Sequence, residues 1–184
     1  RPAVVLYSSC DEIYARPILA EFERRTGIQV RAVFDTELAK TVGLAHRLLA
    51  ERDRPRADVF WNSEAVRTVV LARTGILAPY RSPAADGIPA AYRDPEDRWT
   101  GFACRARVIV YNSERISSGE APRRVRDLAD PRWKGRAGIG NPLTGTTATH
   151  FAALRDAMGP PAFVAWARTF RANGGRATAG NAMV

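Results

Sequence analysis

Three short polar segments contain the residue types that bind oxyanions or hard metal ions. Each follows an apolar run and precedes a helical pattern, so the unpaired backbone N–H groups of a helix start lie beside hydroxyl or carboxylate side chains. Backbone N–H groups bind oxyanions, and carboxylate oxygens bind hard cations. The segments comprise Ser8, Ser9, Cys10 and Asp11, then Asn62, Ser63 and Glu64, and finally Asn141 followed by Thr144, Gly145, Thr146 and Thr147.

The same residue types also cap helices for purely local reasons. Capping alone does not require Gly145 between hydroxyl residues, nor the acids Asp11 and Glu64 beside the other two segments. Three such segments together therefore favour ligand binding. The two acids are candidates for a cation, although an acid in the first turn of a helix also stabilises the helix dipole.

Arg105 and Arg107 alternate along an apolar segment that we predict to be one long strand, residues 104–112. An arginine on a strand between lobes is costly when it lacks a partner, so at least one of the two pairs with an acid or an anion. A structural salt bridge and a ligand contact both stay open.

The sequence does not favour catalysis. Cys10 with His46 or His150 would supply a nucleophile and a base, but neither histidine lies in a known catalytic motif. The motifs G-x-S-x-G, G-x-G-x-x-G and the P-loop are all missing from the sequence. The two cysteines lack C-x-x-C spacing, and a disulfide between Cys10 and Cys104 stays open.

The elements that position these segments alternate between strand and helix. Strands are predicted over 3–9, 28–34 and 57–61, and helices over 14–27, 36–53 and 63–75. This alternation predicts a parallel α/β sheet, whose ligands bind beyond the carboxyl ends of the strands. A second, incomplete α/β unit follows a proline-rich interval, with a strand and turn over 135–142, a strand over 174–180 and helices over 145–158 and 160–172.

Composition limits the function classes. The chain has 184 residues, 46% of them hydrophobic, and a net charge of +9. Lysine occurs only at Lys40 and Lys134, and the arginines are scattered singly or in pairs among acids, which favours a solvated surface over a nucleic-acid interface. A basic nucleic-acid-binding domain is kept as an alternative. No apolar stretch is long enough to span a bilayer, and we interpret the first residues as a strand rather than a signal peptide.

The chain contains, in this order, the motifs "VVLYSS", "FERRTGIQV", "ADVFWNSE", "GILAPY", "WTGF" with "RARVIVYN", "DLADPRWKGRAGIGNPLTGT" and "NGG" with "GNAMV". These motifs resemble those of the extracellular solute-binding proteins of ABC importers, and in particular the branch that binds ferric iron. The resemblance covers nearly the whole chain. It implies a periplasmic-binding-protein-like α/β fold of type 2, with two lobes, a hinge and a central cleft. The expected lobes are 1–103 and 104–184, the second incomplete, because typical members are longer.

The resemblance implies capture of ferric iron with a synergistic anion, as transported ligand rather than cofactor, for delivery to a membrane permease. It assigns the metal to Glu64 and to Asp11, where the family has a histidine. It assigns the anion to Arg105 and to a set of small residues. The expected ligand-binding residues are Ser8, Ser9, Cys10, Ser63, Arg105, Thr144, Gly145, Thr146, Thr147 and Asn181.

Two departures from the family are apparent in the sequence. Besides Asp11 in place of histidine, the chain has no place for the tyrosine pair that binds iron in the family. The alternative ligand is a phosphonate-like or sulfate-like oxyanion without metal. We further expect a periplasmic or extracellular monomer that binds no nucleic acid and is not an enzyme.

Overall fold

The structure is a computed structural model that describes residues 2–35, 42–143 and 145–178. The chain divides into two compact units. Unit 1 contains residues 1–104 and 144–146, and unit 2 contains residues 105–143 and 147–184. The two lobes and the central cleft that the sequence predicts remain a prediction.

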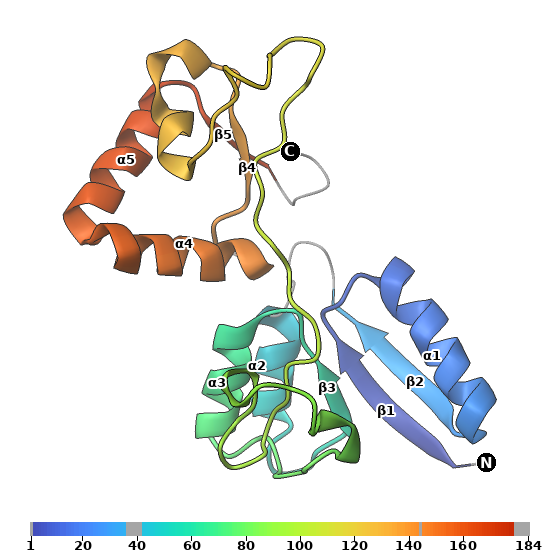
Figure 1. The fold of residues 1–184 in the computed structure, drawn as a ribbon. Helices are drawn as coiled ribbons and strands as arrows, with labels where there is room; N and C mark the ends of the chain where they lie inside the picture. Colours follow the sequence, from blue (N-terminus) through green and yellow to red (C-terminus); the bar gives the residue numbers. More distant parts are fainter. Residues whose placement is uncertain (1, 36–41, 144, 179–184) are drawn as a thin grey trace. The chain divides into compact units, whose positions relative to one another are not determined.

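A three-stranded parallel sheet forms the centre of unit 1. Its strands are β1 (Ala3–Ser8), β2 (Gln29–Phe34) and β3 (Val59–Trp61), in the order β2-β1-β3 (Figure 1). β1 pairs with β2 along its whole length and with β3 from Leu6 onward. All three strands therefore end at the same edge of the sheet, as the alternation of the sequence predicts.

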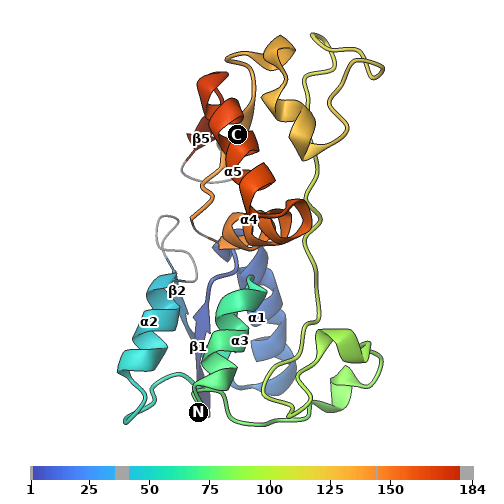
Figure 2. The ribbon, with the colours of Figure 1, turned by 90° about the vertical axis from the view of Figure 1, so that its left-hand side faces the viewer.

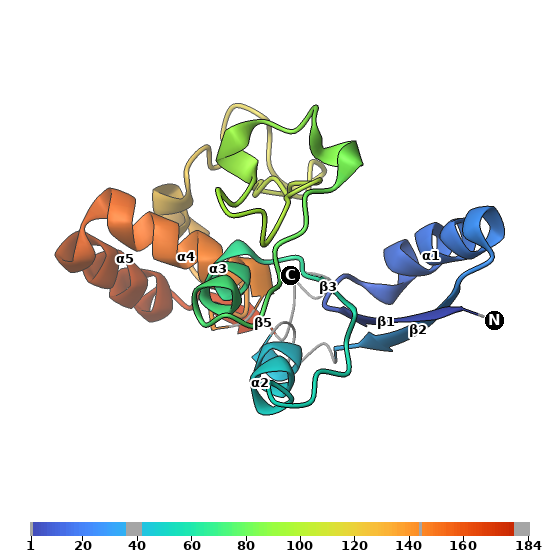
Figure 3. The same ribbon diagram turned by 90° about the horizontal axis from the view of Figure 1, so that it is seen from below.

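Three helices follow the three strands. They are α1 (Glu12–Thr26), α2 (Val42–Ala50) and α3 (Ala65–Arg73), of which α1 and α2 lie on opposite faces of the sheet (Figure 3). α1 ends at Gly27, whose φ of 71° is in the left-handed region and whose N–H donates to Glu23 O at 2.8 Å. The predicted glycine stop is confirmed. The start of the second predicted helix, residues 36–41, lies outside the described residues.

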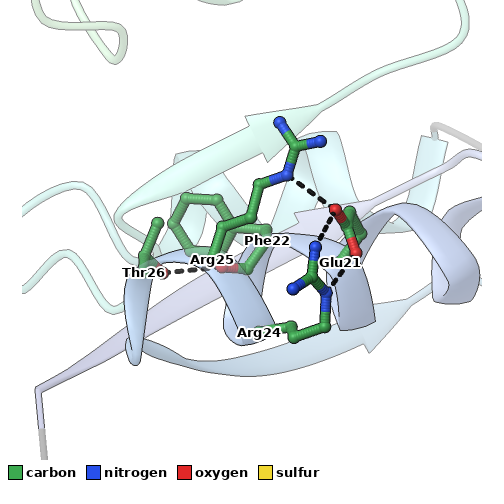
Figure 4. Close-up of polar contacts among 5 residues, drawn as sticks. All are labelled: Glu21, Phe22, Arg24, Arg25 and Thr26. Carbon is green, nitrogen blue, oxygen red and sulfur yellow. Dashed lines mark hydrogen bonds and ion pairs between the residues drawn. The ribbon is translucent and has the colours of Figure 1, made fainter.

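The exposed side of α1 carries ion pairs within one turn of the helix. Glu21 accepts hydrogen bonds from Arg24 Nε at 2.7 Å and from Arg25 Nε at 2.6 Å (Figure 4). Thr26 Oγ1 donates to Phe22 O at 2.7 Å in the last turn. Because these groups are exposed to water, they contribute little to stability.

The core of unit 1 is built around Tyr7 and Leu71, each only 1% exposed. The Tyr7 hydroxyl donates to Glu51 Oε2 at 2.8 Å, and the Arg47 guanidinium lies 4.6 Å from the centre of the Tyr7 ring. Burial and the Glu51 hydrogen bond raise the pKa of Tyr7. Two 3-10 turns, η1 (Pro83–Ala85) and η2 (Ala90–Tyr92), lead away from the sheet.

Unit 2 combines a two-stranded parallel sheet with two helices. α4 and α5 meet at a sharp corner at Gly159, whose φ is 78° (Figure 2). The predicted second-unit helices and strands are confirmed to within a few residues. The elements are η3 (Val125–Ala129), η4 (Pro131–Trp133), β4 (Gly138–Gly140), α4 (Gly145–Met158), α5 (Pro160–Ala172) and β5 (Arg176–Thr178).

An aromatic cluster forms the core of unit 2. Trp166 is 7% exposed, and its ring centre lies within 6.0 Å of those of Phe151, Phe163 and Phe170. Offset and tilted ring contacts of this kind add to the free energy of apolar burial. α4 and α5 are therefore held together mainly by aromatic side chains.

The predicted long strand over residues 104–112 is wrong. This segment has no strand assignment, and Val108 and Val110 are 73% and 85% exposed. An alternating pattern forms a strand only where a neighbouring strand supplies hydrogen bonds, and the residues that the structure describes offer none to this segment. The alternating pattern by itself therefore does not make this segment a strand.

Candidate functional site

The ends of β1 and β3 bring two of the predicted polar segments together. Ser9 Oγ donates to Asn62 Oδ1 at 2.7 Å, and the Ser63 N–H donates to Ser9 Oγ at 3.0 Å. These residues lie side by side because β1 and β3 are neighbours and run in parallel. The sequence alone identified both segments, and the sheet order explains their contact.

The hydroxyl groups that follow β1 point inward in this structure. Ser8 is fully buried, and its Oγ accepts a hydrogen bond from the Cys10 N–H at 3.1 Å. Ser9 is 2% exposed. Both cysteines, Cys10 and Cys104, carry free thiols, so no disulfide ties this turn to residue 104. The serines therefore fix the shape of the turn.

Glu64 is the N-cap of α3. Its Oε1 accepts from the Val66 N–H at 2.5 Å and its Oε2 from the Arg67 N–H at 2.8 Å, and the residue is only 7% exposed. Capping, which the sequence left open, is thus one role of this carboxylate. A carboxylate oxygen can accept more than one contact, so capping does not by itself exclude a metal contact.

Asp11 is at the N-cap position of α1 but makes no side-chain capping hydrogen bond. It is partly exposed, and with Glu64 it is the pair that the sequence assigns to a metal ion. Within residues 2–35, 42–143 and 145–178, no group of three or more His, Cys, Asp or Glu side chains lies close enough to hold a metal.

A cluster of cationic side chains lies at the start of α4 in unit 2. Arg107 Nη2 donates to Thr147 Oγ1 at 2.6 Å, and Thr147 is 5% exposed. Burial and the nearby charge of Arg105 lower the pKa of Arg107. His150 follows Thr147 by three residues on the same helix face, and burial together with Arg107 lowers its pKa. The cluster combines positive charge, N–H donors and a hydroxyl group, which suits an oxyanion.

Gly145 begins α4 with a φ of 55°, in the left-handed region. No atom lies within 4 Å of the position that a Cβ would take, so the backbone conformation rather than space requires glycine here. Thr146 and Thr147 occupy the first turn beside it. Thr144 and Asn181, which the sequence also assigned to the anion, lie outside the described residues.

Sequence reasoning considered an anion contact for both Arg105 and Arg107 but assigned the ligand site to Arg105 alone, and it did not consider His150 for this site. Two signals pointed to them: Arg107 alternates with Arg105, and His150 lies one helical turn after Thr147. In the structure Arg107 donates a hydrogen bond to Thr147 in the first turn of α4.

Comparison with known proteins gives the family. A sequence profile of the bacterial extracellular solute-binding proteins matches residues 58–184. The chain belongs to this family. The solute-binding protein described here is 30% identical to the Fe(3+)-binding periplasmic protein of Serratia marcescens over 172 residues, which are 92% of this chain and 49% of the relative. It is 32% identical to iron uptake protein A1 of a Synechocystis strain over 176 residues, covering 95% of this chain and 46% of the relative.

The fold of this solute-binding protein agrees with that of solved structures. Iron-bound HitA from Pseudomonas aeruginosa matches all of this chain with a TM-score of 0.90 and 26% identity, over 58% of the HitA chain. The predicted periplasmic-binding-protein fold is therefore confirmed. The chain spans about half the length of the curated relatives it matches. None of the helices within the described residues is long and apolar enough to cross a membrane.

Proposed function

We propose that this protein is the substrate-binding component of an ABC transporter, which captures ferric iron with a synergistic anion and delivers it to a membrane permease. The observation that carries the proposal is the Arg107, Thr147 and His150 cluster at the start of α4, a ready anion site in a chain similar to iron-binding proteins. Capture takes place in the periplasm or outside the cell, by a monomer, without catalysis.

In this proposal the carboxylates of unit 1 bind the metal. Asp11 and Glu64 supply hard oxygen ligands, which suit Fe(3+), and Ser8, Ser9, Cys10 and Ser63 surround them in sequence. Two carboxylates leave coordination positions on the metal unfilled, so a bound anion or a further protein ligand completes the set. This need explains why an anion accompanies the metal.

In this proposal the anion binds at the start of α4, near the arginines of residues 105–107. Arg107 and Arg105 supply positive charge, and Thr146 and Thr147 with the backbone N–H groups after Gly145 supply hydrogen-bond donors. Thr144 and Asn181 belong to the same predicted set. A guanidinium binds a phosphate or carboxylate with two parallel hydrogen bonds, which fixes the orientation of the anion.

The test is native mass spectrometry and titration of the metal-free protein with ferric iron, supplied alone and together with phosphate or citrate. We expect the wild type to take up iron only with an anion. Glu64→Ala should abolish metal uptake, whereas Thr146→Val should only weaken it. Arg107→Gln should lower the affinity for the iron–anion pair by about tenfold or more, since it removes a charge-assisted contact.

The alternative function is binding of an oxyanion without metal. Arg107 and Thr147 suit an anion without any metal, and among the described residues no group of three or more His, Cys, Asp or Glu side chains could hold a metal ion, which favours this alternative. Sulfate or phosphate bound without iron, with Arg107→Gln severe and Glu64→Ala mild, would replace the iron proposal by this one. Salt-dependent retention of the protein on duplex DNA would instead support a nucleic-acid-binding domain.

A further inference from the structure

The charge of the chain is distributed very unevenly between its two units. Residues 1–104 contain 15 basic and 14 acidic side chains, a net charge of +1, whereas residues 105–184 contain 13 basic and 5 acidic side chains, a net charge of +8. An arginine-rich composition by itself would raise the charge of both units alike. Nearly all of the net charge therefore belongs to unit 2.

Six of the cations of unit 2 lie in one short segment that contains η3 and η4. All six are exposed, and η3 packs against α5, beside which the segment lies in Figure 1. We call this set the basic surface. Its members are Arg123, Arg124, Arg126, Arg132, Lys134 and Arg136.

The basic surface rests on a well-packed base. Trp133 is 5% exposed, and the guanidinium groups of Arg132 and Arg136 each lie 5.3 Å from the centre of its ring. Asn173, just after α5, donates from Nδ2 to Asp130 O at 2.7 Å and accepts from the Gly135 N–H at 2.9 Å. Because the backbone is held on both sides of Trp133, little order is lost when the cations bind a partner.

The acids within the segment are engaged with its own backbone. Asp127 Oδ2 accepts from the N–H groups of Arg123 and Arg124 at 3.0 and 2.9 Å, and these bonds lower the pKa of Asp127. Asp130 accepts from the Arg132 N–H at 2.9 Å and lies 3.5 Å from Arg132 Nε. Among the residues that the structure describes, the other five cations of the basic surface have no ion pair.

The basic surface has no apolar anchor. Between residues 112 and 142 no large hydrophobic side chain is exposed, and Trp133 is buried beneath its arginines. Protein interfaces depend on buried aromatic or aliphatic anchors at their centre. A surface that offers only spaced positive charge instead suits a smooth anionic surface with many phosphates.

We propose that the basic surface adsorbs unit 2 onto membranes that contain anionic phospholipids. Clustered basic residues are attracted by their charge to the phosphates of an anionic bilayer without inserting into it. The adsorption does not depend on which solute the protein captures. It concentrates the protein at the surface where a membrane permease is found.

The test is co-sedimentation with vesicles of phosphatidylcholine, alone or mixed with phosphatidylglycerol. We expect binding only to the mixed vesicles and release at high salt. Combining Arg123→Gln, Arg124→Gln and Arg126→Gln should weaken binding about tenfold or more, since each cation near an anionic surface contributes to adsorption. A matched control combines Arg52→Gln, Arg54→Gln and Arg56→Gln, three exposed arginines of unit 1, and should change binding less than about twofold.

A charge-conserving variant separates adsorption from folding. Combining Arg123→Lys, Arg124→Lys and Arg126→Lys should keep vesicle binding, and loss of binding in this variant would overturn the proposal. Three other results would overturn it as well. They are a loss of vesicle binding in the unit 1 control equal to that in the unit 2 variant, equal binding to vesicles with and without phosphatidylglycerol, and binding that persists at high salt. Tighter retention on duplex DNA than on the mixed vesicles would assign the surface to nucleic acid instead.

Discussion

Unit 1 and unit 2 share an α/β design but use their polar side chains in opposite ways. In unit 1 the polar groups at the carboxyl edge of the sheet hydrogen-bond to one another, as Ser9 does with Asn62, or cap a helix, as Glu64 does. In unit 2 the corresponding place, the start of α4, gathers Arg107 and His150. The polar groups named in unit 1 thus serve local structure, whereas those named in unit 2 bring positive charge beside a hydroxyl group.

The largest expected effect tests how differently the two units are stabilised. Trp166→Ala removes the centre of the unit 2 aromatic cluster and should cost about 3–5 kcal/mol of unfolding free energy, measured by urea denaturation. Phe102→Ala is the control in unit 1, since Phe102 lies 5.7 Å from the Trp61 ring but is 66% exposed, and it should cost less than about 1 kcal/mol. Similar losses of unfolding free energy in the two variants would contradict the proposed difference in stabilisation between the two units.

The next effect concerns the cap of α3. Glu64→Ala deprives the Val66 and Arg67 N–H groups of their acceptor and should lower the unfolding free energy by about 1–2 kcal/mol. Glu64→Gln keeps one oxygen acceptor and should cost less. Unchanged stability in Glu64→Ala would mean that the carboxylate does not stabilise α3. Its role would then be ligand binding, as we propose for the charged groups of unit 2.

A smaller effect is a pH dependence that belongs to unit 2. The folded protein holds the pKa of His150 below its ordinary value of about 6.5, through burial and Arg107, so the unfolded chain binds the proton first as pH falls. Stability from this group is complete above about pH 6.5 and decreases as pH falls from there towards the folded pKa. His150→Gln should flatten the unfolding free energy over that range, as measured by urea denaturation at several pH values. A steeper decline in His150→Gln would contradict the assigned sign.

The smallest effect should come from the exposed ion pairs of α1 (Figure 4). Glu21→Ala breaks its hydrogen bonds to Arg24 and Arg25, but all three side chains are exposed and screened by water. We expect no measurable change in melting temperature by calorimetry, at low or high salt. A clear destabilisation would show that surface charge matters in unit 1 as well.

The fold was largely predictable because its signals are local. Apolar periodicity located the strands and helices, and Gly27 and Gly145 marked a helix end and a helix start. The segment 104–112 could not be predicted, because strand formation depends on a partner that the pattern of the segment itself does not contain.

The candidate site was predictable only in part. The strand pattern placed Ser9 and Ser63 at one edge of the sheet, but the hydrogen bond from Arg107 to Thr147 depends on side-chain direction, which the pattern does not contain. The unequal net charge of the two units was also not apparent from the sequence pattern. Cations that stand singly or in pairs along the sequence look dispersed until the chain is divided into its units.

Because Trp133 is buried beneath two guanidinium groups, its fluorescence can be used to follow anion binding. The four tryptophans divide evenly, with Trp61 and Trp99 in unit 1 and Trp133 and Trp166 in unit 2, and only the latter two are buried. Their indole emission should lie further to the blue than that of the unit 1 pair. With Trp166 replaced by phenylalanine, the blue component would arise from Trp133 alone, so quenching or a spectral shift on addition of an anion would report directly on Arg132 and Arg136.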